Sequence, residues 1–311
     1  METNNLYFLN FYSMMLFFEK KEYLANLTDF AKLLGGKEFD AKGHNIEVID
    51  NEKQYGYFWC LNDYNGDGEF PIFGPSCYVG NESIRKRFIG SRPALNLSEI
   101  KEDFKITKMD GLTIEEIEYG EYPKTVVSED LEQILEGLYN SNSLVLTGKT
   151  YTVDKTPFDD EIKPFEELKL CEYLYNNKKY VRVKCNNDKG TFSNGRILEN
   201  GRYYFVEVEP LKWNVDVKYN FLITKDIVFS GIQFDNKNFN KDFLFSNIKN
   251  YMDTYFSKNI IPSKNYIKSV NLDEELTMNL DLCGKTSELI PLLEDIKKNI
   301  KVEVKNIVRK R

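Results

Sequence analysis

The spacing of apolar side chains predicts one helix and two extended segments in the first hundred residues. Over residues 19–36, apolar positions recur every three or four residues, and the pair Gly35–Gly36 follows the last of them. This spacing is typical of an amphipathic helix with a glycine stop. The aromatic run 55–61 predicts a strand, and Pro93 places the extended segment 90–100 at a sheet edge or a bend.

The apolar pattern changes to a period of two in the second half of the chain. Within residues 171–185, apolar and polar positions alternate on both sides of Asn176–Asn177, which predicts a hairpin that turns at this pair. Asn-Gly pairs at 194–195 and 200–201 predict two more tight turns. Residues 221–234 continue the strand pattern.

Three helices are predicted outside these strands. Ser128 is placed to cap a helix that runs to about residue 138, with acidic residues in its first turn. Ser246 is placed to cap a short aromatic helix, and a last helix is expected from about Thr286. The expected buried stripe of the Ser128 helix consists of Leu131, Ile134, Leu135 and Leu138.

These elements predict an α+β fold that is β-rich, with antiparallel hairpins, a meander and peripheral helices. The 20 tyrosines and 22 phenylalanines agree, because aromatic side chains favour half-buried pleated surfaces. The expected organisation is an N-terminal α/β unit over 1–110, a β-rich domain with two helices over 111–265, and a C-terminal helical extension over 266–311.

Charge is unevenly distributed along the chain. The whole chain has 42 Lys and Arg against 49 Asp and Glu, a net charge of −7, whereas residues 99–172 hold 19 acidic and 8 basic side chains, a net charge of −11. This balance disfavours direct contact with nucleic acid and predicts a protein partner with a basic surface, such as a nucleic-acid-binding protein. A solvated acidic face is the alternative. The acidic candidates for partner contact are Glu115, Glu116, Glu118, Glu121, Asp159, Asp160 and Glu161.

Cysteine and histidine usage restricts the possible chemistry. The five cysteines lie at wide, irregular spacings, which match neither a disulfide framework nor a zinc site and predict a reducing, cytoplasmic setting. The single histidine, His44, excludes multi-histidine metal centres, and no catalytic residue is nominated. The apolar run 6–18 is too short to span a bilayer and no basic residue precedes it, so a buried element and no membrane association are expected.

Residues 62–70, NDYNGDGEF, carry the first half of a calcium-loop signature. Asp63, Asn65 and Asp67 alternate before a glycine, which fits the oxygen ligands that calcium prefers. The bidentate Glu that a full EF-hand loop needs is replaced by Gly74. The segment therefore predicts a turn, with calcium at the three alternating residues as the alternative and no other cofactor expected.

Two Gly-Lys-Thr triplets, at 148–150 and 284–286, are similar to the end of a phosphate-binding loop. Such a loop needs a glycine five residues earlier, where Ser143 and Asn279 stand. Because the backbone amides cannot surround a phosphate without that glycine, neither triplet is predicted to bind a nucleotide.

Five short blocks stand in order along the chain: DF..LLGG at 29–36, RPAL at 92–95, YGEYP at 119–123, KYVRV at 179–183 and VEPLKW at 208–213. In this order they resemble an uncharacterised family of bacterial proteins common in Firmicutes and their mobile elements. The resemblance covers roughly residues 28–265. It implies a fold class and a bacterial setting, but no activity.

A second resemblance concerns the aromatic strand that contains Tyr57-Phe58-Trp59 and the later RPAL block. Together they resemble compact β folds related to C-type lectins and to formylglycine-generating enzymes. In the enzymes of this group, the resemblance implies chemistry that uses a closely spaced cysteine pair near the C-terminus. Cys171 and Cys185 are too far apart for this pair and Cys283 stands alone, so that chemistry does not transfer.

The sequence favours a non-enzymatic cytoplasmic binding protein whose acidic surface contacts a macromolecular partner. The family resemblance sharpens this hypothesis to a mobile-element-encoded inhibitor of a host nucleic-acid-binding defence protein, in the manner of anti-CRISPR proteins. Two alternatives stay open. One is an enzyme with an unrecognised site, and the other is a lectin-like binder that depends on calcium.

Overall fold

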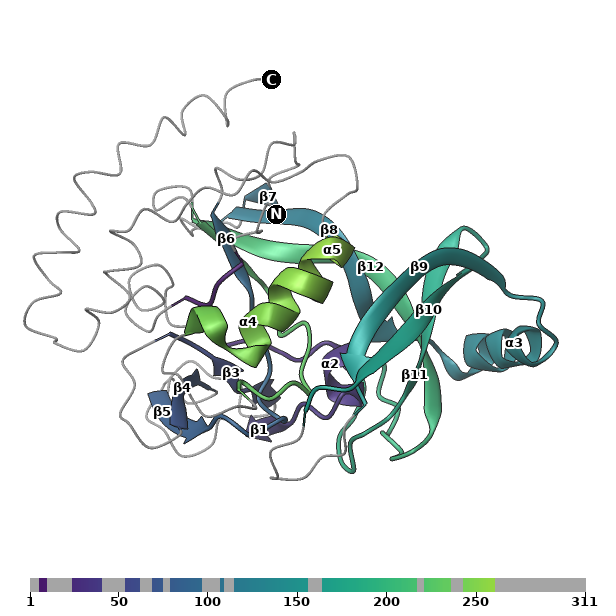
Figure 1. Cartoon of the computed structure of the whole chain (residues 1–311). Coiled ribbons are helices and arrows are strands. Elements are labelled where there is room, and N and C mark those ends of the chain that lie inside the picture. The colour runs from purple at the N-terminus through teal and green to yellow at the C-terminus, as the bar shows by residue number, and fades with distance from the viewer. Residues whose placement is uncertain are drawn as a thin grey trace, which may run out of the picture.

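The computed structural model describes residues 6–9, 24–40, 54–61, 69–74, 79–96, 107–108, 115–155, 164–216, 221–235 and 243–260. In Figure 1 a large curved sheet crosses the molecule, a helical rod lies against it, and the helix α3 (Glu129–Asn140) stands at one end. All strand pairs among the described residues are antiparallel and the helices are few. The predicted β-rich α+β fold is therefore confirmed.

The large sheet consists of eight strands: β6 (Ala94–Asn96), β7 (Thr107–Lys108), β8 (Glu115–Val126), β9 (Val145–Asp154), β10 (Glu167–Tyr175), β11 (Lys178–Lys184), β12 (Tyr203–Asp216) and β13 (Phe221–Thr224). Its main path runs β6-β13-β12-β11-β10-β9. The long strand β12 organises the sheet, because β11 pairs with its beginning, β13 with its end and β8 with most of its length. Short β7 pairs with β8.

A helical rod packs against this sheet and consists of α4 (Asn247–Tyr251), the π-helical turn η3 (Met252–Phe256) and α5 (Ser257–Ile260). Its aromatic side chains meet strands from two parts of the sheet. The rings of Tyr122 on β8 and Tyr151 on β9 lie 5.5 Å apart, and the ring of Phe256 lies 4.9 Å from that of Tyr122. All three side chains are buried, so the rod, β8 and β9 share one core.

The rod begins where the sequence predicts, because the Ser246 hydroxyl accepts a hydrogen bond from a backbone N–H of the first turn at 3.1 Å. A π-helical turn is wider than an α-helical one, so residues five apart face the same side. Tyr251 and Phe256 have this spacing and both are buried. At the end of the rod, Ile260 packs on Gly120, where a Cβ would lie 2.5 Å from the Ile260 carbonyl oxygen and where φ is +71°. Only glycine fits there.

The prediction of a helix over 19–36 is wrong for residues 24–28, which the structure describes and which are not helical. Only α2 (Asp29–Leu33) is α-helical, and residues 24–28 are not. Thr28 caps this helix and donates its own backbone N–H to the Ile227 carbonyl at 3.0 Å. Pairing with a distant segment therefore overrides the helical spacing of the apolar residues.

The predicted turns are confirmed. Asn176 and Asn177 have φ of 48° and 61° between β10 and β11, as a two-residue type I′ hairpin turn requires. Gly195 and Gly201 have φ of 85° and 81° in the turns expected at the Asn-Gly pairs. Gly35, with φ of 100°, follows α2 as the expected glycine stop.

Helix α3 begins at the predicted cap, Ser128, and Leu131 and Leu138 of the expected stripe are half-buried. Leu135 is fully buried as expected, whereas Ile134 is 48% exposed. Glu132 is only 5% exposed, because two arginines pair with its carboxylate. Ion pairs therefore orient the helix together with its apolar stripe.

The two units predicted over 1–110 and 111–265 share one core among the described residues. Strand β6, which follows Pro93 at the end of the main path, pairs with β13, and one cluster of buried side chains extends from Leu6 to Ile260. The extension predicted over 266–311, with its helix, lies outside the described residues. The remaining elements are β1 (Glu38–Asp40), β2 (Gln54–Gly56), β3 (Phe58–Trp59), β4 (Glu69–Phe73), β5 (Val79–Ser83) and the 3₁₀ turn η2 (Phe243–Phe245).

The DF..LLGG block anchors the loop that precedes β12. The Asp29 carboxylate accepts hydrogen bonds from the Ser193 backbone N–H and hydroxyl, both at 2.7 Å, and from the Val126 N–H at 3.0 Å. The Asn187 side-chain amide donates to the Gly36 carbonyl at 2.9 Å. The block therefore joins α2 to β8 and to the loop, which is a structural role.

The RPAL block is structural as well. Arg92 is 1% exposed and its Nε donates to the Thr224 carbonyl at 2.6 Å. Its guanidinium also lies 5.4 Å from the centre of the Phe58 ring. The arginine therefore links the segment before β6 to β13 and to the aromatic strand β3.

Replacement of Asp29 by alanine is expected to lower the free energy of unfolding by about 3 kcal/mol, because each buried donor left without an acceptor costs about 1–3 kcal/mol. Guanidinium unfolding followed by tryptophan fluorescence measures this change. The matched control is Asp188→Ala, which removes an exposed carboxylate from the same loop and is expected to change stability by less than about 0.5 kcal/mol. Equal losses in the two variants would contradict the anchoring role.

Candidate functional site

Much of the acidic charge of the middle segment is paired inside the fold. The Glu116 carboxylate binds Lys212 at 3.0 Å and Lys225 at 2.5 Å. Partial burial by itself raises the pKa of Glu116, but the hydrogen bonds from Lys225 and Lys212 outweigh it and hold the pKa below its ordinary value. Basic residues of the second half of the chain thus neutralise a carboxylate that the sequence assigns to an external partner.

The other acidic candidates on β8 have different surroundings. Glu121 forms an ion pair with Lys179 of β11, whereas Glu118 is exposed and has no ion pair among the described residues. The backbone of Glu115 pairs within β8 with β7 and β12. Glu115, Glu116, Glu118 and Glu121 thus lie on one strand, but they do not form a single acidic patch that is free to bind a partner. Asp159, Asp160 and Glu161 lie outside the described residues.

The calcium candidates Asp63, Asn65 and Asp67 also lie outside the described residues, as does His44. Within the described ranges, no group of three or more His, Cys, Asp or Glu side chains has the geometry to hold a metal ion. The calcium hypothesis therefore stays a prediction for residues 62–70.

The Gly-Lys-Thr triplet at 148–150 lies inside strand β9, whereas a phosphate loop would stand between a strand and a helix. Gly148 has φ of 86°, next to a register shift between β9 and β10. The Lys149 ammonium donates to the Asn259 carbonyl in α5 at 2.9 Å and lies 5.1 Å from the centre of the Tyr151 ring. Burial lowers the pKa of Lys149. The triplet therefore forms a β-bulge whose lysine binds the end of the helical rod.

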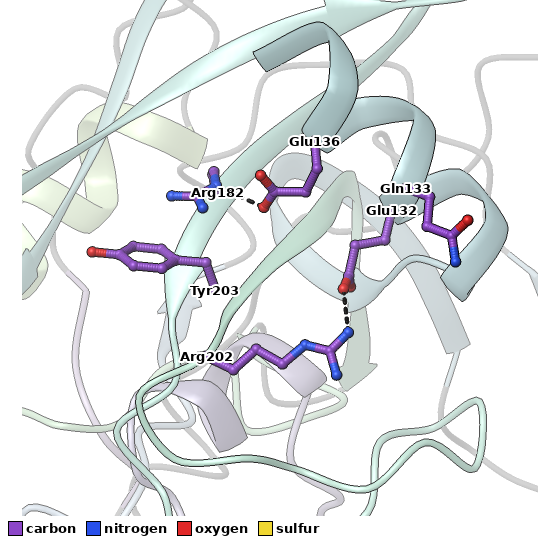
Figure 2. A pocket seen from close by; sticks show the side chains of 6 residues that line it. All are labelled: Glu132, Gln133, Glu136, Arg182, Arg202 and Tyr203. Carbon is purple, nitrogen blue, oxygen red and sulfur yellow. Dashed lines mark hydrogen bonds and ion pairs between the residues drawn. The ribbon is translucent and has the colours of Figure 1, made fainter. Parts of the chain in front are cut away.

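A concavity of about 370 Å³ opens between α3 and the strands β11 and β12, and Figure 2 shows it from close by. It exists because α3 packs on the sheet through a separate small cluster that includes Leu135, Tyr180 and Phe205, which leaves a space beside the helix. Polar side chains from the helix and from the strands meet there. The lining residues are Glu132, Gln133, Glu136, Arg182, Arg202 and Tyr203.

Two aromatic rings contact Arg182 on one side of the concavity. Its guanidinium carbon lies 4.0 Å from the centre of the Tyr203 ring and 4.6 Å from that of Tyr139. Its Nε donates to the Glu136 carboxylate at 2.8 Å, the pair that Figure 2 marks beside Tyr203. Stacking and the ion pair together fix the orientation of the guanidinium.

The other side of the concavity is an ion-pair network around Glu132. Its carboxylate accepts from Arg202 at 2.7 Å and from Arg196 at 2.9 Å. Arg202 also donates to Glu199 at 2.7 Å, so both of its terminal nitrogens are bound to carboxylates. With Arg182 and Glu136 included, the concavity is close to electrically neutral.

Large apolar side chains are exposed on α3 and on the strands that follow it. Ile134 lies on α3, and Leu146 of β9 pairs with Tyr173, which packs in the same cluster as α3. Val145 and Leu174 pair with each other on the opposite face of the sheet. Val145 and Leu146 are each about 60% exposed. Single exposed apolar side chains are ordinary on a protein surface, but two such neighbours are less so. We call the following residues the α3 surface: the six that line the concavity, with Ile134 and Leu146.

None of the concavity residues was nominated from the sequence. One signal was present, because Glu132 and Glu136 are one helical turn apart and therefore share a face of α3. Arg182 alternates with Val181 and Val183, which marks it as facing the opposite side of the sheet from the core. Only the packing of α3 on β11 and β12 shows that these two faces meet.

Comparison with protein-family models, with curated proteins and with solved structures found no match for this chain. Among the described helices, none combines the length and the apolar character that a membrane crossing needs. The α3 surface is therefore the feature of the molecule that points to a function.

Proposed function

We propose that this chain is a protein-binding module that docks a partner on the α3 surface. The observation that carries the proposal is the concavity in which two tyrosine rings contact Arg182, beside a helix that also exposes Ile134. Tyrosine and arginine dominate the binding energy of protein interfaces, particularly where their orientation is fixed before binding. Exposed apolar groups nearby supply the area that a complex buries.

The proposal rests on the α3 surface rather than on the acidic segment as a whole. Glu116, Glu121, Glu132 and Glu136 already pair with cations of this chain, so a basic partner would have to displace them. Competition of this kind reduces the gain from each new ion pair, and surface pairs contribute only about 0–1 kcal/mol. Shape and aromatic contacts are therefore the stronger source of affinity.

The double variant Ile134→Asp, Tyr203→Ala tests the docking surface, because both side chains are more than 40% exposed and neither belongs to the main core. We expect the unmodified chain to capture one protein in stoichiometric amount from a lysate of the organism that encodes it. Calorimetry with the purified pair should then show a loss of affinity of at least tenfold in the double variant, the size expected for interface hot spots.

The matched control is Phe245→Ala in η2, which removes an exposed large apolar side chain outside the α3 surface. This variant is expected to bind the partner as the unmodified chain does. Equal binding by the double variant, or the absence of any saturable complex, would contradict the proposal.

A further inference from the structure

We propose that Arg182 is the anion-binding residue of the α3 surface, and that it takes a carboxylate or phosphate group presented by the partner protein. This inference rests on the proposed docking function, because it names the chemistry that the partner brings to the same surface. It starts from a difference between the two arginines of the concavity.

Arg202 is saturated, whereas Arg182 is not. Both terminal nitrogens of Arg202 donate to carboxylates, one to Glu132 and one to Glu199. Arg182 uses only its Nε, which donates to Glu136, and among the described residues no group accepts from its two terminal nitrogens. The side chain is 21% exposed, and its terminal nitrogens are not among the buried polar atoms that lack a partner. They therefore reach solvent.

The orientation of Arg182 makes these free donors a prepared site. The Tyr203 and Tyr139 rings both contact the guanidinium, and its Nε donates to Glu136. The terminal edge that remains carries parallel N–H donors whose spacing matches the two oxygens of a carboxylate or phosphate. Since the side chain is already immobilised, binding an anion costs little further conformational entropy.

A second cation lies two residues further along β11, on the same face of the strand as Arg182. Lys184 lies directly opposite Tyr203 in the pairing of β11 with β12, is exposed, and has no ion pair among the described residues. The net charge of −7 is spread over the whole chain, and at physiological salt charges more than about 8 Å away are largely screened. The terminal N–H donors of Arg182, rather than the charge around them, therefore select an anion.

Arginine side-chain NMR titrations of the intact chain at physiological ionic strength test the inference. The probes are a capped triglutamate peptide, the capped triglutamine peptide of the same shape, and inorganic phosphate. We expect triglutamate or phosphate to shift the Arg182 Nε–H signal saturably and triglutamine to leave it unchanged. Saturation by phosphate alone would assign the ligand group as a phosphate, and saturation by triglutamate would assign it as a carboxylate.

Arg182→Lys keeps the positive charge but loses the forked donors and the stacking. We expect it to weaken anion binding at least tenfold, which is the loss of about one charge-assisted hydrogen bond. Arg85→Lys is the matched control, because Arg85 is exposed and follows β5, at the opposite end of Figure 1 from α3. Equal binding of triglutamate and triglutamine to the unmodified chain, or full anion affinity in Arg182→Lys, would overturn the inference.

The two proposals fail separately. If Arg182 binds anions but the chain captures no partner, the docking function is wrong and the anion site stands. If a partner binds the α3 surface but neither anion shifts the Arg182 signal, the docking function stands and the present inference is wrong.

Discussion

Alkaline pH is expected to unfold this protein steeply, because three tyrosines of its core alone remove about 4 kcal/mol of unfolding free energy per pH unit above pH 10. Burial raises the pKa of Tyr122, of Tyr151 and of Tyr251 above its ordinary value. The hydrogen bond from Tyr151 to the Glu172 carboxylate, at 2.6 Å, raises the pKa of Tyr151 further. All three hydroxyls lie in the core that β8, β9 and the helical rod share.

The sign follows from proton binding in the two states. Near pH 10 the unfolded chain begins to release the three tyrosine protons, whereas the folded chain keeps them. Their contribution to stability is therefore complete below about pH 10 and is lost as the pH rises toward the folded pKa values. Each tyrosine contributes about 1.4 kcal/mol per pH unit in that window. A total stability of about 5–15 kcal/mol would be exhausted within roughly one to four pH units.

Guanidinium unfolding at a series of pH values measures this slope, with tyrosinate absorbance as the second signal. Tyr251→Phe removes one of the three protons and is expected to reduce the slope by about 1.4 kcal/mol per pH unit. Phe256→Leu is the control, because it weakens the same core but keeps every hydroxyl, so the curve should shift without a change of slope. Titration of these tyrosines near pH 10 in a protein that stays folded would contradict the prediction.

Arg87→Met is expected to lower the free energy of unfolding by about 3–5 kcal/mol, the cost of a buried charge that has lost its partner. Arg87 and Asp154 form an ion pair at 2.5 Å, and each side chain is 1% exposed. The same Arg87 nitrogen donates to the Gly231 carbonyl at 3.0 Å. The pair connects the segment after β5 to strand β9, so its loss weakens the contact between the first 110 residues and the large sheet.

The double variant Arg87→Met, Asp154→Asn separates charge from packing. The amide that Asp154→Asn introduces is neutral and would still offer an oxygen to the Glu166 N–H, which donates to the Asp154 carboxylate at 3.2 Å. We expect the double variant to recover at least half of the loss, because no uncompensated charge remains buried. Additive losses from the two single changes, measured by guanidinium unfolding, would show that the ion pair is not the source of the effect.

Local features of the fold were predictable because short-range chemistry decides them. The Asn176–Asn177 turn, the Asn-Gly turns and the caps at Ser128 and Ser246 depend on residues within about four positions of one another. The helix expected over 19–36 failed because Thr28 pairs with Ile227, about two hundred residues away. No local spacing reports such a contact.

The candidate site was less predictable than the fold. The acidic candidates were chosen because acidic residues are abundant in the middle segment. In the structure, Glu116 and Glu121 pair with lysines of β11, β12 and the segment after β13. Arg182 was not nominated, since one arginine in an alternating strand has no special spacing. Its importance comes from Tyr139, Tyr203 and Glu136, which reach it from α3 and from β12.

The β-rich class, the hairpin turns and the helix caps follow from the order of residues alone, because alternation, positive φ and side-chain capping are properties of neighbouring residues. Which charges remain free to meet a partner emerges only once the chain is folded. Along the sequence, the acidic segment and the basic remainder suggest two separate charged surfaces. In the fold, the antiparallel pairing of β8 with β12 brings acidic and basic side chains into ion pairs. Coulomb attraction depends on distance in space, and distance in space is what the sequence pattern leaves open.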